Sequence, residues 1–181
     1  MPIKQIKTTP DPILRKKTEK VGEITQEIRT LIKDLLDTVK HAEEPEGAGL
    51  ASPQIGVSKR VCVVRDFLPD PSDPTNPQKH LIQDIVLVNP KIISKSKETD
   101  IDWEGCLSVP DTYGKVQRAT KIKLKALDQD GNPIKIKTEG FLARTIQHEV
   151  DHLDGVLFTD KVVGNVITQE ELDALEEVRQ L

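Results

Sequence analysis

The chain has 181 residues, of which 36% are hydrophobic and 31% charged, and its formal net charge is −4 at pH 7. This mix is that of a soluble globular protein, and the length suits one domain spanning residues 1–181. The N-terminal residues lack a secretory signal, and no apolar run reaches the ~20 residues that span a bilayer. Because both signs of charge are scattered without a dense basic patch, we expect a cytoplasmic protein with no membrane partner and no specific DNA partner.

The first half of the chain shows one helical pattern followed by two strand patterns. Apolar residues recur at helical spacing over residues 24–40, where Thr25 can cap the start. An acidic, glycine-rich loop is expected over 42–56, and a buried strand over 60–67. Prolines and aspartates predict a surface loop over 69–77, after which strand character resumes over 85–93.

The second half predicts a hairpin and two helices. Lysines alternate with apolar residues over 121–127 and again over 134–137, which indicates a hairpin with one face in water. A helix is expected over 140–153. A polar C-terminal helix is expected over 168–180, where Thr168 and Glu171 match a capping box. Since the strands are grouped and do not alternate with helices, the sequence predicts an α+β fold.

The segment His148-Glu149-Val150-Asp151-His152 is the strongest chemical signal in the chain. Two histidines at positions i and i+4 share one helix face and can bind the same metal ion. Glu149 lies between them, where it can act on water at that metal. The alternative is a surface helix with two solvated histidines, but half of the chain's four histidines fall in this one segment.

Two histidines do not complete a catalytic metal site, which usually has three protein ligands and one open position. One source of a third ligand is the set of carboxylates that follow the second histidine, namely Asp154, Asp160, Glu170 and Glu171. The other source is Cys106, because a thiolate is a strong ligand for Fe²⁺ or Zn²⁺. The second cysteine, Cys62, lies in an apolar strand and is expected to be a buried core thiol.

Residues 47–56 form a glycine-rich segment that does not match a nucleotide-binding loop. It follows a helix and not a strand, Ser52 stands where the third glycine belongs, and the lysine of a phosphate-binding loop is missing. Two interpretations remain open. The glycines can let the backbone approach a ligand, with Gln54 offering an amide donor, or the segment is a plain structural turn.

Three segments in this order resemble the motifs of the peptide deformylase family. They are GAGLASPQ at 47–54, EGCLS at 104–108 and QHEVDH at 147–152, and the resemblance extends over about residues 9–161. The one departure is Ser52, where the family has a second alanine. The resemblance implies an α+β fold with antiparallel strands around a central metal-binding helix. It also implies a hydrolase that removes the N-formyl group from the formylmethionine of new polypeptides and releases formate.

The resemblance also implies a role for each matching residue. It makes Cys106, His148 and His152 the ligands of one divalent metal ion, with Fe²⁺ in the cell and Zn²⁺, Ni²⁺ or Co²⁺ as substitutes. It makes Glu149 the general acid and base. Gln54 and the backbone N–H of Leu107 then stabilise the oxyanion. The residues implied to bind substrate are Gly49, Glu104, Gly105, Phe141, Arg144 and Thr145.

Two of these residues carry a further expectation. Glu104 is expected to pair with Arg118. Arg144 either lines the pocket wall with its aliphatic stem, keeping its charge at the rim, or faces elsewhere. The expected partners are N-formylmethionyl nascent peptides, with transient contact to the ribosome.

Two competing functions remain at this point. One is a His-Glu-x-x-His metallopeptidase with a carboxylate as third ligand. The other is a non-catalytic metal-binding or ribosome-associated module, against which the presence of Glu149 and Gln54 argues, because binding alone needs neither.

Overall fold

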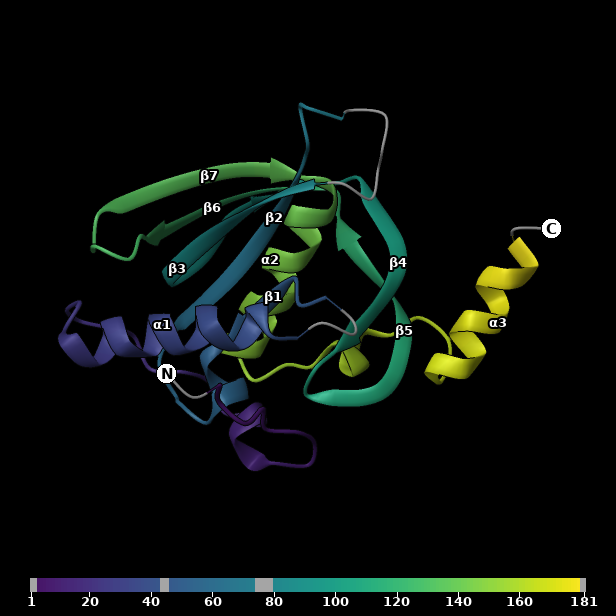
Figure 1. The fold of residues 1–181 in the computed structure, drawn as a ribbon, viewed down its shortest axis with the longest axis horizontal. Coiled ribbons are helices and arrows are strands. Elements are labelled where there is room, and N and C mark those ends of the chain that lie inside the picture. The colour runs from purple at the N-terminus through teal and green to yellow at the C-terminus, as the bar shows by residue number, and fades with distance from the viewer. Residues whose placement is uncertain (1–2, 43–45, 74–79, 180–181) are drawn as a thin grey trace.

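The computed structural model describes residues 3–42, 46–73 and 80–179, and these form an α+β fold, as the sequence predicts (Figure 1). Every pairing between the named strands is antiparallel. The α-helices are α1 (Gln26–Lys40), α2 (Gly140–Leu153) and α3 (Gln169–Arg179). The strands are β1 (Gly49–Ala51), β2 (Val61–Pro69), β3 (His80–Lys95), β4 (Thr99–Cys106), β5 (Val109–Ala119), β6 (Lys121–Leu127) and β7 (Pro133–Glu139).

A five-stranded sheet with the order β1-β2-β3-β6-β7 has a helix against each face. Successive side chains of a strand point to opposite faces. Cys62 and Val64 of β2 therefore join the core beneath α2, while Val61 and Val63 join the core beneath α1. This double burial explains why β2 begins with an unbroken apolar run.

A second sheet, made of β4 and β5 alone, lies on the other side of α2 (Figure 1). A smaller apolar core holds it against the segment that follows α2, through Val109, Val116, Leu157 and Phe158. Helix α2 thus runs between two sheets, and a residue at the end of β4 can reach it.

The chain enters α2 directly from β7, without a loop. Gly140, the first residue of the helix, has φ +64, which lies in the left-handed region that glycine adopts without strain. The apolar side of α2, including Ala143, Ile146 and Leu153, packs on the large sheet. This packing fixes how far the helix is rotated about its axis, and so fixes the direction of the remaining side chains.

The structure confirms most of the predicted elements and corrects two. Helix α1 begins after its cap Thr25, and β6 and β7 pair over their full length. The expected loop over 42–56 is wrong in part, because it contains the short strand β1 and a 3-10 turn at Ser52–Ile55. Strand β5 has no regular alternation of burial, and the sequence did not predict it. Of the expected loop over 69–77, residues 74–77 lie outside the described ranges.

Helix α3 extends away from both sheets (Figure 1). The Glu171 carboxylate accepts from the backbone N–H of Thr168 at 2.8 Å, and the Glu171 N–H donates to the Thr168 hydroxyl at 3.3 Å, which confirms the capping box. Within the described ranges, no helix is both long and apolar enough to cross a membrane.

Candidate metal centre

Three potential ligand atoms converge where the end of β4 meets α2. The Nε2 atoms of His148 and His152, one helical turn apart, lie 3.2 Å from each other. The Sγ atom of Cys106 lies 3.2 Å from Nε2 of His152. All three ligand atoms lie within 4.8 Å of one another, and no other group of this kind occurs in the described ranges. This cluster could hold a metal ion.

The downstream carboxylates considered as third ligands do not belong to this cluster. Asp154 pairs with Arg60 at 2.8 Å, and Asp160 pairs with Arg15 and accepts from the backbone N–H of Leu157. Glu171 caps α3, as described above. Between the two sources of a third ligand, the geometry favours Cys106.

The donor set suits a divalent transition metal. His148 Nδ1 lies 3.0 Å from the Glu104 carboxylate, and a carboxylate only accepts hydrogen bonds, so Nδ1 carries the proton. The lone pair of His148 Nε2 then faces Cys106 and His152. A hydrogen bond from the other ring nitrogen to a carboxylate is what usually orients a histidine that binds a metal. One thiolate with two imidazoles is a donor set preferred by Fe²⁺ and Zn²⁺.

Glu104 accepts hydrogen bonds from three side chains around it. Arg118 donates at 2.7 and 2.8 Å, which confirms the expected ion pair, and Arg144 donates at 2.8 Å. Burial alone raises the pKa of Glu104. The hydrogen bonds from Arg118 and His148 outweigh that effect and hold the pKa well below its ordinary range. Glu104 is therefore ionised, and both of its oxygens are engaged.

A second carboxylate extends this network outward. Asp151, on α2 beside His152, accepts from Arg118 at 2.5 Å and from Lys161 at 2.7 Å. A chain of alternating charges thus runs from Lys161 through Asp151, Arg118 and Glu104 to the imidazole of His148. Asp151 lies within the sequence motif at 147–152, but its spacing there predicts no role for it.

Glu149 lies buried beside the three ligand atoms, at 3% exposure, and its Oε2 has no hydrogen-bond partner among the described residues. Burial raises its pKa to about 7, because the ionised form loses hydration. The backbone of β1 passes so close that a Cβ at Gly49 would lie 2.6 Å from Oε1 of Glu149. The glycine at 49 thus allows a close approach of β1 to this carboxyl group.

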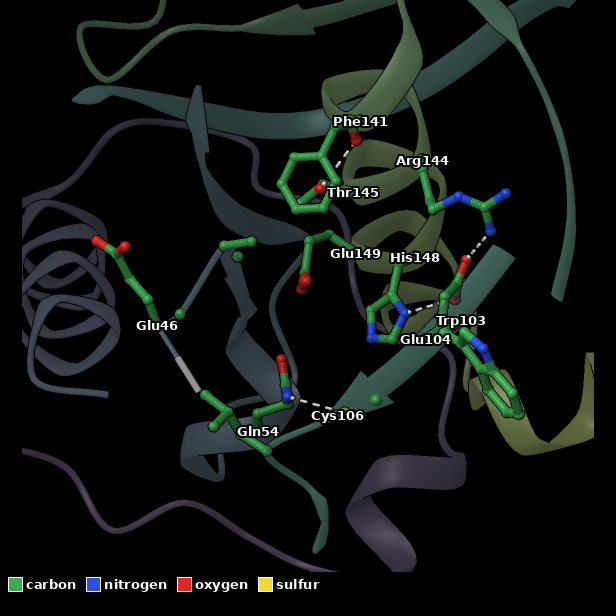
Figure 2. A pocket seen from close by; sticks show the side chains of 15 residues that line it. Glu46, Gln54, Trp103, Glu104, Cys106, Phe141, Arg144, Thr145, His148 and Glu149 are labelled. Carbon is green, nitrogen blue, oxygen red and sulfur yellow. Dashed lines mark hydrogen bonds and ion pairs between the residues drawn. The ribbon is translucent and has the colours of Figure 1, made fainter. Parts of the chain in front are cut away.

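Gln54 and Leu107 line the same pocket. The Gln54 side chain is buried, accepts from the backbone N–H of Ala51 at 2.8 Å, and directs Nε2 toward Cys106 Sγ at 3.6 Å and Ser108 Oγ at 3.2 Å. Leu107 belongs to the two-residue link between β4 and β5. Figure 2 shows the Gln54, His148 and Glu149 side chains directed into one space.

A pocket of about 190 Å³ opens above these groups. Eleven of the twelve residues singled out from the sequence line it, and the twelfth, His152, lies beneath it in the ligand cluster. The eleven are Gly49, Gln54, Glu104, Gly105, Cys106, Leu107, Phe141, Arg144, Thr145, His148 and Glu149. Their individual roles toward a substrate stay predictions, although the structure brings all of them together.

The structure matches neither of the two orientations considered for Arg144 in full, because the residue lines the pocket but its guanidinium is engaged inside the protein. Its guanidinium turns away from the pocket, donating to Glu104 and to the backbone carbonyls of Val116 at 2.9 Å and Asp100 at 3.1 Å (Figure 2). The Arg144 charge therefore does not stand at the rim. Phe141, one turn earlier on α2, is 59% exposed at the mouth of the pocket.

Glu46 and Trp103 also line the pocket and were not predicted from the sequence. Each stands directly next to a quoted motif, and that adjacency was the only available signal. Ser52, the departure from the family pattern, is fully buried, and its hydroxyl donates to the backbone carbonyl of Lys59. The hydroxyl is thus satisfied inside the protein, so the substitution leaves no unpaired polar group.

Comparisons with known proteins agree with this geometry. The sequence profile of the polypeptide deformylase family matches residues 3–166. The peptide deformylase of Halothermothrix orenii is 47% identical over 163 residues, which cover 90% of this chain and 96% of the relative. That of Dictyoglomus thermophilum is 43% identical over 169 residues, covering 93% and 99%.

Solved structures show the same likeness in three dimensions. The crystal structure of peptide deformylase from Thermotoga maritima has a TM-score of 0.77 at 32% identity, covering 91% of this chain and 100% of that one. The Met-Ala-Ser-bound class I type b peptide deformylase from Acinetobacter baumannii has a TM-score of 0.76 at 35% identity, covering 89% and 99%. On the profile match, the identities and the shared fold, this chain belongs to the polypeptide deformylase family.

Proposed function

We propose that this chain hydrolyses the N-formyl group of formylmethionine at the start of newly synthesised polypeptides and releases formate. The observation that carries the proposal is the convergence of Cys106, His148 and His152 beside Glu149 and Gln54 in one pocket. Formyl hydrolysis needs a metal ligand set, a proton carrier and an oxyanion donor, and the pocket offers a group for each.

Each group has one task in this reaction. Cys106, His148 and His152 hold the metal ion, which, when bound, supplies Lewis-acid polarisation of the formyl carbonyl and lowers the pKa of water. Glu149 takes a proton from the attacking water and delivers it to the nitrogen of the leaving amine. The Gln54 amide and the Leu107 N–H donate to the formyl oxygen as negative charge develops there. Loss of one such donor typically costs ~2.7–4 kcal/mol of transition-state stabilisation.

The pocket has a volume of about 190 Å³ and would hold both the formyl group and the first side chain. A formyl carbon bears only hydrogen, so it is the smallest acyl group that the site could receive. Thr145 and Phe141 offer an apolar wall for the methionine side chain. The Acinetobacter baumannii relative was solved with Met-Ala-Ser bound, which is the peptide left when formyl-Met-Ala-Ser loses its formyl group.

We place this reaction in the cytoplasm, with Fe²⁺ as the native metal and nascent chains at the ribosome as the substrate source. A thiolate beside Fe²⁺ makes both ligand and metal oxidisable, so the iron enzyme should lose activity in air. Replacement by Ni²⁺ should protect it. Metal analysis of protein purified without oxygen tests the identity of the ion.

The deciding experiment is a formate-release assay on formyl-Met-Ala-Ser, with acetyl-Met-Ala-Ser as the matched substrate. We expect release of formate in proportion to bound metal and negligible release of acetate. Cys106→Ala should lose both metal and activity, whereas Cys62→Ala should keep both. Cleavage of internal peptide bonds, or full metal occupancy in Cys106→Ala, would instead support the carboxylate-ligated metallopeptidase.

A further inference from the structure

A basic groove lies outside the metal pocket and shares no lining residue with it. Its volume is about 1060 Å³, and its cationic lining residues are Lys17, Lys20, Arg60, Lys91, Lys125 and Lys135. The acidic lining residue, Asp154, is already paired with Arg60 at 2.8 Å. This concentration of positive charge occurs in a protein whose net charge is −4.

The register of the large sheet builds the floor of this groove. Lys125 of β6 lies opposite Lys91 of β3 on one side and opposite Lys135 of β7 on the other. Two residues along, Lys123 lies opposite Lys137. These lysines are dispersed in the sequence, and pairing of the strands gathers them on one exposed face. The linear sequence does not reveal this grouping, because it arises only when β3, β6 and β7 pair.

The arrangement is unfavourable without a ligand. Like charges directly opposite each other across a sheet destabilise the pair. Within the described part of the chain, the neighbouring Lys121 has Glu139 as an ion-pair partner at 2.7 Å, but none of the five lysines named above has one. A bound polyanion would supply the missing negative charge.

We propose that this groove binds the phosphodiester backbone of a nucleic-acid duplex. The lysines extend across three strands, whereas a single small anion would need only one or two of them. Among the described residues that line the groove, none is aromatic, so it lacks the stacking surfaces that bind unpaired bases. Contacts with a phosphodiester backbone are independent of sequence and sensitive to salt.

The groove leaves formyl hydrolysis undisturbed, because its lining residues and those of the metal pocket are separate sets. Binding and catalysis can therefore be measured on the same variants. Failure of this proposal would leave the proposed deformylase activity intact, and the reverse also holds.

The test is fluorescence anisotropy with labelled RNA and DNA duplexes over a range of salt concentrations. We expect wild-type protein to bind with Kd in the ~10⁻⁴–10⁻⁶ M range that is typical of non-specific binding, weakening linearly with log salt. The triple variant Lys91→Gln, Lys125→Gln, Lys135→Gln should bind at least about tenfold more weakly, with a salt slope shallower by about 2–3. A lower Kd for one of the two duplexes identifies the nucleic acid that the groove prefers.

The matched control is Lys4→Gln, Lys33→Gln, Lys40→Gln, which removes the same charge. Each of these lysines pairs with an aspartate, and none lines the groove. The control should bind duplex as wild type does, and both triple variants should keep wild-type formate release. Equal loss of binding in the two triple variants would overturn the proposal. So would wild-type protein that binds phosphatidylserine vesicles through these lysines but binds neither duplex.

Discussion

Gly49 and Glu149 lie in direct contact, since a Cβ at position 49 would stand 2.6 Å from the Glu149 Oε1 atom. The two residues come from β1 and α2, elements far apart in the sequence. Separations this short do not occur between real Cβ and oxygen atoms, so a larger residue at 49 must displace the carboxyl group or β1 itself.

Gly49→Ala should therefore lower activity without removing the metal. The added methyl pushes the Glu149 carboxyl out of place, while Cys106, His148 and His152 are untouched. A misplaced catalytic group can cost about 10²-fold in rate. Formate release and metal content, measured on the same sample, check this. Gly22→Ala is the control, because nothing lies within 4 Å of a Cβ at that position. Normal kcat in Gly49→Ala would show that the close contact has no catalytic importance.

Replacing the proposed proton carrier should separate catalysis from metal binding. Glu149→Ala is expected to keep the fold and the metal but to lose about 10²–10⁴-fold in kcat, the usual contribution of general acid–base groups. Substrate affinity should change much less. Gln54→Ala should give a smaller loss, since it removes one hydrogen-bond donor and leaves proton transfer in place. Loss of metal together with activity in Glu149→Ala would mean that this residue is a ligand or a determinant of the fold.

The two cysteines should differ in reactivity toward a thiol reagent. Cys62 is fully buried, and burial raises the pKa of its thiol well above the ordinary value. Cys106 is only partly buried. We expect Cys106 alone to react in the folded, metal-free protein, neither cysteine to react when metal is bound, and both to react in denaturant. Reaction of Cys106 at the same rate with and without metal would argue against its role as a ligand.

Asp151→Asn should weaken metal binding although Asp151 contacts none of the three ligand atoms. The change weakens its ion pairs with Arg118 and Lys161, which loosens the chain of contacts that holds Glu104 against His148. Loss of such supporting contacts typically costs 10–100-fold in metal affinity. Competition with a chromophoric chelator measures this without reference to activity. Lys161→Gln changes the residue at the solvent-exposed end of this series of ion pairs, and it should lower metal affinity much less.

Lys125→Glu should raise the melting temperature. The residue stands between Lys91 and Lys135, so the change replaces two like-charge pairs by two opposite-charge pairs. We expect an increase of about 1–3 °C. Lys33→Glu is the contrasting control, because it breaks an ion pair with Asp37 and should lower the melting temperature. A lower melting temperature in Lys125→Glu would show that repulsion among Lys91, Lys125 and Lys135 does not destabilise the sheet.

The elements that the sequence predicted well are those with a long, regular pattern. Helix α1 has seven buried residues at helical spacing, and β6 alternates exposed lysines with buried residues over 121–126. β1 has only three residues and is stabilised by pairing with β2. No local sequence pattern predicts that pairing. β5 contains Pro110 and Gly114 and packs unevenly, so its burial does not alternate.

The residues of the candidate site also fall into those that a local sequence pattern predicts and those that it does not. Two of the proposed ligands, His148 and His152, are one helical turn apart, so their proximity could be inferred from spacing alone. Cys106 required either the family resemblance or the three-dimensional structure, because β4 and α2 are separated by more than 30 residues. Asp151, Trp103 and Glu46 were given no role although each lies in or next to a quoted motif, because their contacts in the site depend on distant segments of the chain.

The three proposed ligands lie in two separate parts of the fold, and this has a consequence for folding. His148 and His152 belong to a helix packed on the large sheet, whereas Cys106 belongs to the small sheet. A metal ion held by all three acts as a reversible cross-link between these two parts, much as a disulfide would. Free metal then stabilises the folded state by ~1.4 kcal/mol for every tenfold rise above its dissociation constant. The supply of metal would thus set the free energy of unfolding of the chain as well as its catalytic competence.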